Sequence, residues 1–247
     1  MPNEGTNYSK NAVHDIRPKI LFRKVETSFP DKNVTFNVMI PTSSIGGLTL
    51  LESSILVTLT TLLAPSEFFE FGTFHGATSV LLAANSAEHS RIMTVDLPRD
   101  SVVPMPSPDG NSALHLQNDV ENDNYLRRSF VANGALYLDR ADDVYKRKVR
   151  RMYCDSRTLD PVELGLTGRF DFIFIDGGHD FETVSIDTAN ALKMAKDDAV
   201  IIWHDYRSEI HREVTQFVDG FSRDNAVIHV EHTMLAFTLR GRFKNLI

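Results

Sequence analysis

The chain has 247 residues, 42% hydrophobic and 24% charged, a composition that is ordinary for a globular protein of one or two domains. Its 26 basic and 33 acidic residues leave a formal charge of −7, which argues against non-specific nucleic-acid binding. The single cysteine excludes a disulfide framework, and the most apolar stretch, residues 53–66, is too short to cross a bilayer, so we expect a cytoplasmic protein without a membrane partner.

The first 45 residues are predicted to form an irregular N-terminal extension. Pro18, Pro30 and Pro41 interrupt it, although alternating apolar residues between 34 and 40 allow a short strand. From Leu48 to Leu63 apolar residues recur every three to four positions, which predicts a helix that ends before Pro65. We therefore expect the main domain to cover residues 46–247.

Beyond this helix, short apolar segments alternate with helical ones. The predicted strands are residues 67–71, 91–95, 151–154, 170–175 and 199–203, and the predicted helices are residues 77–87, 181–196 and 208–221. Near-continuous apolar strands separated by helices predict a parallel sheet that is covered on both faces. Residues 227–230 and 234–239 are joined too closely for a parallel crossover, so they predict an antiparallel hairpin.

A long segment between Asp96 and Arg151 breaks this alternation. It opens with several prolines, and loops of such length are usually functional or disordered. We interpret residues 98–140 as a lid-like insertion, with a passive surface loop as the alternative.

Glycine and acidic residues follow the first two predicted strands, at the edge where open parallel sheets bind ligands. The segment from Glu70 to Ser79 contains Gly72 and Gly76, which permit a tight turn and a close backbone approach to a ligand. Its G-x-x-x-G spacing differs from the G-x-G-x-x-G of dinucleotide sites. Asp96 ends the second strand, where a carboxylate can accept both hydroxyls of a ribose. Together these features favour a nucleoside-containing cofactor.

Acidic and histidine residues follow the fourth and fifth predicted strands. Because these strands are expected to be neighbours, Asp176 and Asp205 can converge on a divalent metal ion. His204 does not suit octahedral Mg²⁺ and better suits a softer ion or a general base. Metal-free acid–base chemistry, and purely structural caps and turns, are the alternatives.

The ordered set of these motifs resembles class I S-adenosylmethionine-dependent methyltransferases, in particular a bacterial branch with E-x-G-T-x-x-G, I-D-G-x-H and H-D-Y motifs. The matching segments are Glu70–Ser79, Thr94–Pro98, Cys154–Arg157, Ile175–His179 and Trp203–Tyr206. The resemblance extends from about Leu48 to Arg240 but does not cover the insertion. It implies a Rossmann-like, mostly parallel sheet of seven strands with helices on both faces and a C-terminal antiparallel hairpin.

The resemblance also implies where the cofactor would bind. The methionine and ribose side would be lined by Glu70, Gly72, Thr73 and Gly76, the ribose hydroxyls would be held by Asp96, and the adenine would meet Leu97, Asp155 and Ser156. Related metal-dependent O-methyltransferases place acidic magnesium ligands where Asp176 and Asp205 stand.

We therefore expect a methyltransferase that acts on a small-molecule acceptor, more often at oxygen than at nitrogen. The candidate catalytic residues are His204, His179 and Asp176, with either histidine as the base, or with a metal on Asp176 and Asp205 activating the acceptor. The alternatives are a non-catalytic cofactor-binding or regulatory module on the same fold, an NAD-dependent oxidoreductase and a metal-dependent hydroxylase-like relative. The acceptor's identity and the formation of a homo-oligomer stay open.

Overall fold

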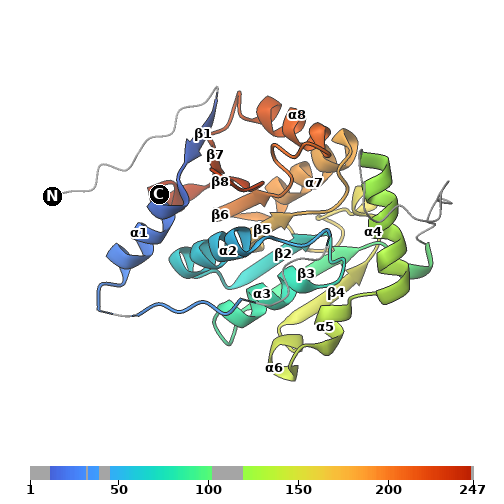
Figure 1. Ribbon diagram of the computed structural model, residues 1–247, viewed down its shortest axis with the longest axis horizontal. Helices are drawn as coiled ribbons and strands as arrows, with labels where there is room; N and C mark the ends of the chain where they lie inside the picture. Colours follow the sequence, from blue (N-terminus) through green and yellow to red (C-terminus); the bar gives the residue numbers. More distant parts are fainter. Residues whose placement is uncertain (1–11, 32, 39–44, 102–118, 246–247) are drawn as a thin grey trace.

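Figure 1 shows the computed structural model of the protein, which describes residues 12–31, 33–38, 45–101 and 119–245. The strands are β1 (Val13–Ile16), β2 (Glu67–Phe71), β3 (Arg91–Asp96), β4 (Val149–Tyr153), β5 (Phe170–Ile175), β6 (Ala195–Trp203), β7 (Val227–Val230) and β8 (Ala236–Leu239). The helices are α1 (Pro18–Ser28), α2 (Leu50–Leu63), α3 (Ala77–Asn85), α4 (Asp119–Asn133), α5 (Leu136–Arg140), α6 (Asp143–Lys146), α7 (Phe181–Met194) and α8 (Arg212–Phe221).

The eight strands of the described residues form one mixed sheet in the order β1-β7-β8-β6-β5-β2-β3-β4. The pairs from β4 through β3, β2 and β5 to β6 are parallel, whereas β8 runs antiparallel to both β6 and β7. The predicted fold class, with its C-terminal antiparallel hairpin, is confirmed.

The sheet has one strand more than the seven predicted. The additional strand, β1, comes from the extension that was predicted to be irregular, and it pairs in parallel with β7, with Val13 opposite Val227. Only four residues long, β1 carries His14 and Asp15 at its centre, so it has no apolar run that the sequence could reveal. The strand suggested near residues 34–40 is not found in the described residues 33–38, and residues 39–44 lie outside the described part.

Apolar side chains cover both faces of the sheet. On one face, α1, α2 and α3 pack against the sheet through buried residues such as Leu21, Leu56 and Leu82. On the other face, α7 and α8 pack through residues such as Val184 and Val218. Because β5 is central, its phenylalanine and isoleucine residues are buried on both sides, as a parallel strand between two helical layers requires.

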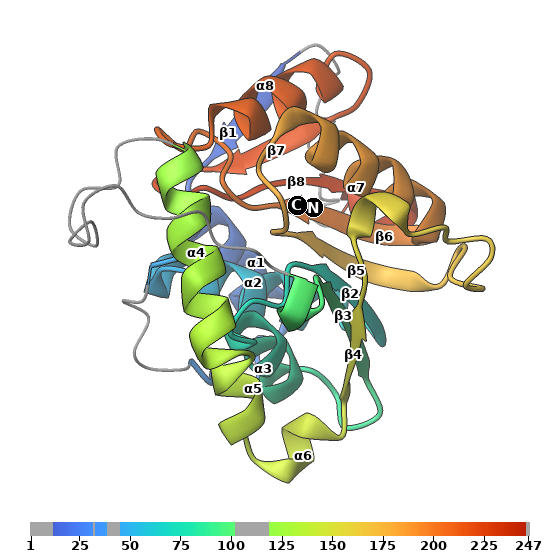
Figure 2. The ribbon, with the colours of Figure 1, turned by 90° about the vertical axis from the view of Figure 1, so that its right-hand side faces the viewer.

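The described part of the predicted insertion is helical. Helix α4 crosses the end of the sheet to which the parallel strands point, and α5 follows it and packs on α3 (Figures 1 and 2). Residues 102–118 of the insertion lie outside the described part of the chain. Among the described helices, none combines the length and apolar character that a membrane span requires.

Candidate active site

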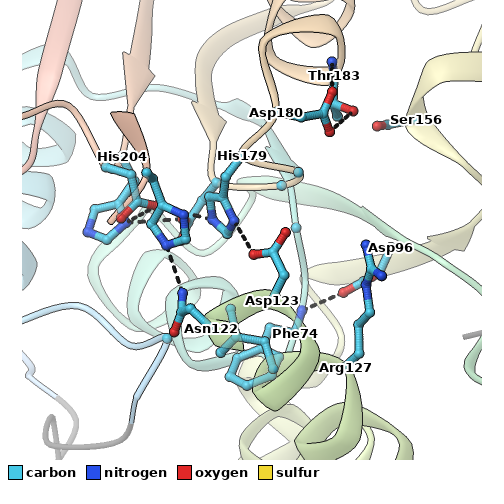
Figure 3. A pocket seen from close by; sticks show the side chains of 18 of the residues that line it. Phe74, Asp96, Asn122, Asp123, Arg127, Ser156, His179, Asp180, Thr183 and His204 are labelled. Atoms are coloured by element: carbon cyan, nitrogen blue, oxygen red, sulfur yellow. Dashed lines mark hydrogen bonds and ion pairs between the residues drawn. The ribbon is translucent and has the colours of Figure 1, made fainter. Parts of the chain in front are cut away.

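A cavity of about 450 Å³ is lined by residues at the carboxyl ends of the parallel strands and by residues of α4. It is lined by residues that directly follow β2, β3, β4, β5 and β6, and by residues of α4 and of the segment before α2. Its volume is in the range of small-molecule and cofactor sites. Figure 3 shows side chains from several of these elements facing the same space.

The turn after β2 needs glycine at two positions. Gly72 has a φ of +90°, and a β-carbon there would clash with the backbone carbonyl oxygen of Asp176. Gly76 has a φ of +78° and directly precedes α3, where a β-carbon would meet Leu138. The turn is therefore packed against β5 on one side and against the insertion on the other.

Asp96 is held in place by backbone amides at the end of β3. Its Oδ2 accepts a hydrogen bond from the Phe74 amide at 2.6 Å, and its Oδ1 accepts one from the Leu97 amide at 2.7 Å. Burial raises the pKa of the Asp96 carboxyl above its usual value. Each carboxylate oxygen has a second lone pair, so both can still accept a hydrogen bond from a ligand hydroxyl.

Three of the predicted cofactor residues, Glu70, Thr73 and Gly76, are not part of the cavity wall. The Glu70 carboxylate accepts a hydrogen bond from the Ser79 hydroxyl, and burial raises the pKa of Glu70 to about 8. The Thr73 hydroxyl lies 2.7 Å from that of Thr94 on the neighbouring strand. These three residues therefore support the turn without lining the cavity, whereas Gly72, Asp96 and Leu97 line it.

Asp155 and Ser156 follow β4 and also line the cavity. The Asp155 carboxylate is engaged by the Arg157 guanidinium, with Oδ2 2.7 Å from Nη2, and this contact lowers the pKa of Asp155. The predicted adenine side of the cavity therefore includes an ion pair rather than an unpaired carboxylate.

The residues after β5 and β6 converge, as the sequence predicted. His204 Nδ1 lies 3.1 Å from Asp176 Oδ1 and 3.2 Å from Asp205 Oδ2, so one ring nitrogen contacts both carboxylates. Burial raises the pKa of Asp176. Burial acts in the same direction on Asp205, but the adjacent histidines hold the pKa of Asp205 well below its usual range. Burial by itself would lower the pKa of His204, but the charges of the two aspartates raise it well above the usual value.

His179 joins this cluster from the loop after β5. Its Nε2 lies 3.2 Å from Asp205 Oδ2, and its Nδ1 lies 2.8 Å from Asp123 Oδ1 on α4. Burial would lower the pKa of His179, but the hydrogen bonds to these two carboxylates raise it to about 10. The ring also stacks on His211 with 3.7 Å between centroids.

Two of these contacts come from residues that the sequence analysis did not single out. Glu52, on α2, is buried with Oε1 3.6 Å from His204 Nε2, and although burial opposes it, His204 lowers the pKa of Glu52 to about 2. The T-x-x-E pattern at residues 49–52 is a capping-box signal, and the structure has that cap, but the pattern does not indicate the contact with His204. Asp123 lies in the insertion, outside every motif.

Comparisons with known proteins agree with this architecture. A family model described as a methyltransferase domain matches residues 69–206. The solved structure of methyltransferase PaMTH1 from Podospora anserina, with bound SAH, is 14% identical to this chain with a TM-score of 0.50, over 93% of this chain and 90% of that one. Cofactor-bound Rv0187 from MTB is also 14% identical with a TM-score of 0.50, over 90% and 88%. The search of curated proteins gave no match.

The sheet order, the glycine turn and the strand-end cavity define a class I methyltransferase fold, which the likeness to the two solved structures also shows. Because the family match covers more than half of the chain, the protein belongs to this methyltransferase-domain family. The resemblance to S-adenosylmethionine-dependent methyltransferases is thereby confirmed.

Proposed function

We propose that the protein transfers the methyl group of S-adenosylmethionine to an oxygen atom of a small-molecule acceptor. The observation that carries this proposal is a single cavity with two chemically distinct sides. One side has the Gly72 turn and Asp96, and the other has the carboxylates and histidines that follow β5 and β6. The family membership and the SAH bound to the structurally similar PaMTH1 support this cofactor.

In this proposal, Asp96 accepts hydrogen bonds from the ribose hydroxyls, and Leu97 packs against the adenine. Asp155 and Ser156 border the adenine amino group, and Gly72 allows the backbone to approach the methionine part. Glu70, Thr73 and Gly76 act by fixing the shape of the turn. The sulfonium already activates the methyl group, so the protein's main task is to align acceptor oxygen, methyl carbon and sulfur.

The acceptor hydroxyl must lose its proton, and Asp176 is the best placed of the predicted catalytic residues to receive it. Its side chain is 19% exposed, compared with 11% for His179 and 7% for His204. The burial that raises the pKa of Asp176 makes it a stronger base than an ordinary aspartate. His204 and His179 each have both ring nitrogens directed at carboxylates, so we assign them the task of orienting Asp176 and Asp205.

The same cluster fits a divalent metal ion. Donor atoms of Asp176, His179 and Asp205 all lie within 4.8 Å of one another. Two carboxylates and an imidazole suit Mn²⁺, Co²⁺ or Zn²⁺ better than Mg²⁺, which prefers oxygen ligands and water. Bound there, such an ion would supply Lewis acidity that lowers the pKa of the acceptor hydroxyl. Asp176 would then serve as a ligand rather than as the base.

The test uses S-adenosylmethionine carrying a ¹³C methyl group, with a panel of phenols, sugars and aliphatic alcohols and their amine counterparts. The ¹³C shift of the transferred methyl group distinguishes O-methyl from N-methyl products. We expect O-methyl products, and we expect Asp176→Asn to lose turnover while it still binds the cofactor in calorimetry. Methylated amines alone would refute O-methylation, and a folded protein that binds no cofactor would refute methyl transfer.

A further inference from the structure

We propose that Asp123, on helix α4 of the insertion, is a positioning residue that holds the His179 ring against Asp205, so that the insertion completes the catalytic cluster. This inference rests on the proposed function, because it assigns a role within the same site.

Contacts near both ends of helix α4 hold it against the rest of the protein, where it crosses the end of the sheet to which the parallel strands point (Figure 2). Near its C-terminal end, the Arg99 guanidinium donates hydrogen bonds to the carbonyl oxygens of Val131 and Ala132 at 2.7 and 2.9 Å. In the same C-terminal part of the helix, Ser129 Oγ lies 3.2 Å from the ring of His75, which belongs to the glycine turn. The helix therefore connects the cofactor side of the cavity with the side that carries His179.

At the N-terminal end of α4, two successive side chains reach two stacked histidines, and Figure 3 shows one of these contacts, between Asp123 and His179. Asp123 Oδ1 lies 2.8 Å from His179 Nδ1, and the neighbouring Asn122 Nδ2 lies 2.7 Å from His211 Nε2. The two imidazole rings are 3.7 Å apart at 24°. A contact at one nitrogen and a stacked neighbour together restrict how the His179 ring can turn.

The two ring nitrogens of His179 contact different parts of the site: one faces α4 and the other faces the catalytic cluster. Asp123 engages Nδ1, which leaves Nε2 directed at Asp205, 3.2 Å away. The hydrogen bond made by one imidazole nitrogen determines how the other nitrogen is presented. A carboxylate behind a histidine is also the arrangement that orients catalytic and metal-ligating histidines in general. Asp123 would therefore orient the His179 ring both if Asp176 acts as the base and if a metal ion binds at Asp176, His179 and Asp205.

Asn122 provides a matched control because it precedes Asp123 on the same helix and makes the equivalent contact with His211. Removing either side chain removes one contact between α4 and the core. Removing Asp123 also releases His179, the histidine that touches Asp205. A role in docking α4 and a role in positioning His179 therefore predict different results for the two variants.

The first experiment compares Asp123→Ala, Asp123→Asn and Asn122→Ala with the wild type, using an acceptor identified in the panel. We expect Asp123→Ala to lower kcat by about 10- to 100-fold, the usual cost of losing such a supporting carboxylate, with little change in acceptor KM or cofactor Kd. Asp123→Asn should recover part of kcat, because its amide oxygen can still accept from Nδ1. Asn122→Ala should keep a kcat close to that of the wild type.

The second experiment needs no acceptor. In ¹⁵N-histidine-labelled protein, the hydrogen-bonded Nδ1 proton of His179, assigned with a His179→Gln variant, should give a slowly exchanging signal. We expect this signal in the wild type and in Asn122→Ala, and we expect it to disappear in Asp123→Ala.

The outcomes separate this inference from the proposed function. An Asp123→Ala variant that keeps both its kcat and the His179 signal would overturn the positioning role. Equal losses of kcat, cofactor affinity and melting temperature in the Asp123 and Asn122 alanine variants would also overturn it, because the residue would then only dock α4. If the folded wild type binds no S-adenosylmethionine, the proposed function fails, and the His179 signal still decides whether Asp123 holds the ring.

Discussion

The backbone amide of Phe74 donates a 2.6 Å hydrogen bond to Asp96 Oδ2, which joins the glycine turn after β2 to the end of β3. Phe74 has a φ of +45°, a left-handed conformation that costs energy for a residue with a β-carbon. The opposite oxygen of Asp96 accepts from the Leu97 amide at 2.7 Å. The carboxylate is therefore fixed before a ligand binds, which reduces the entropy that binding would cost.

The first prediction concerns this carboxylate. Asp96→Ala should weaken S-adenosylmethionine binding by about 10- to 100-fold, because hydrogen bonds to a charged group contribute about 1.5–3 kcal/mol. Isothermal titration calorimetry measures the Kd directly. Asp198→Ala is the control, because Asp198 pairs with Arg242 and does not line the cavity. An unchanged Kd in a folded Asp96→Ala protein would remove Asp96 from the cofactor site.

The second prediction concerns the stability of the protein as a function of pH. Because burial raises the pKa of Glu70 to about 8 from 4.5, the folded protein keeps a proton on Glu70 that the unfolded chain has already lost. The free energy of unfolding therefore falls as the pH rises between these two values. In the Glu70→Gln variant the side chain is neutral at every pH, so this pH-dependent loss of unfolding free energy is absent. The melting temperature of the variant should therefore rise relative to that of the wild type as the pH increases.

Thermal melting of both proteins at several pH values from about 5 to 9 checks this sign. The gain should be small at the acidic end and largest above the raised pKa of Glu70. Asp198→Asn serves as the comparison, because its side chain is partly exposed at the surface. A melting-temperature difference that does not change with pH would show that Glu70 is not a protonated buried carboxyl.

Strands whose apolar runs end at a charged or glycine-containing group could be predicted from the sequence. The bounds of β2, β5 and β7 agree with the predicted segments, because each is a short, mostly apolar segment that is followed by a glycine or an acidic residue. The convergence of Asp176 and Asp205 could be predicted in the same way, because Asp176 directly follows β5, Asp205 lies two residues after β6, and these two strands are parallel neighbours. The order of the parallel strands determines this part of the site, and the apolar segments in the sequence are sufficient to predict those strands.

Contacts between distant segments could not be predicted in this way. The strand β1 finds its partner through pairing with residues more than 200 positions away, and its four residues have no alternating pattern. Glu52 reaches His204 only because α2 packs beside the sheet, and Asp123 reaches His179 only because α4 crosses the cavity. The charged and amide residues of α4 gave no apolar periodicity from which to predict a helix.

The third prediction concerns the close approach of the glycine turn to β5. Gly72→Ala should lower the free energy of unfolding by at least about 2 kcal/mol, because an alanine combines backbone strain with a clash against the Asp176 carbonyl. Gly168→Ala is the matched control, since Gly168 also has a positive φ, +63°, but a β-carbon there would meet nothing within 4 Å. Urea unfolding of both variants separates the effect of the clash from that of the backbone strain. Equal losses of unfolding free energy in the two variants would show that the turn can shift to accommodate a β-carbon at Gly72.

The fourth prediction concerns metal binding at Asp176, His179 and Asp205. A ligand that binds only the folded state raises the melting temperature, so Mn²⁺ should stabilise the wild type after chelator treatment and should stabilise Asp205→Asn much less. The shift should increase from about pH 6 to about pH 8, because His179, whose pKa is raised to about 10, must release its proton to bind an ion. Mg²⁺ should give a smaller shift than Mn²⁺, because an imidazole ligand suits Mn²⁺ better.

Differential scanning fluorimetry with each ion measures these shifts in melting temperature. An equal Mn²⁺ shift in the wild type and in Asp205→Asn would place the bound ion elsewhere on the protein and leave Asp176 free to act as the base.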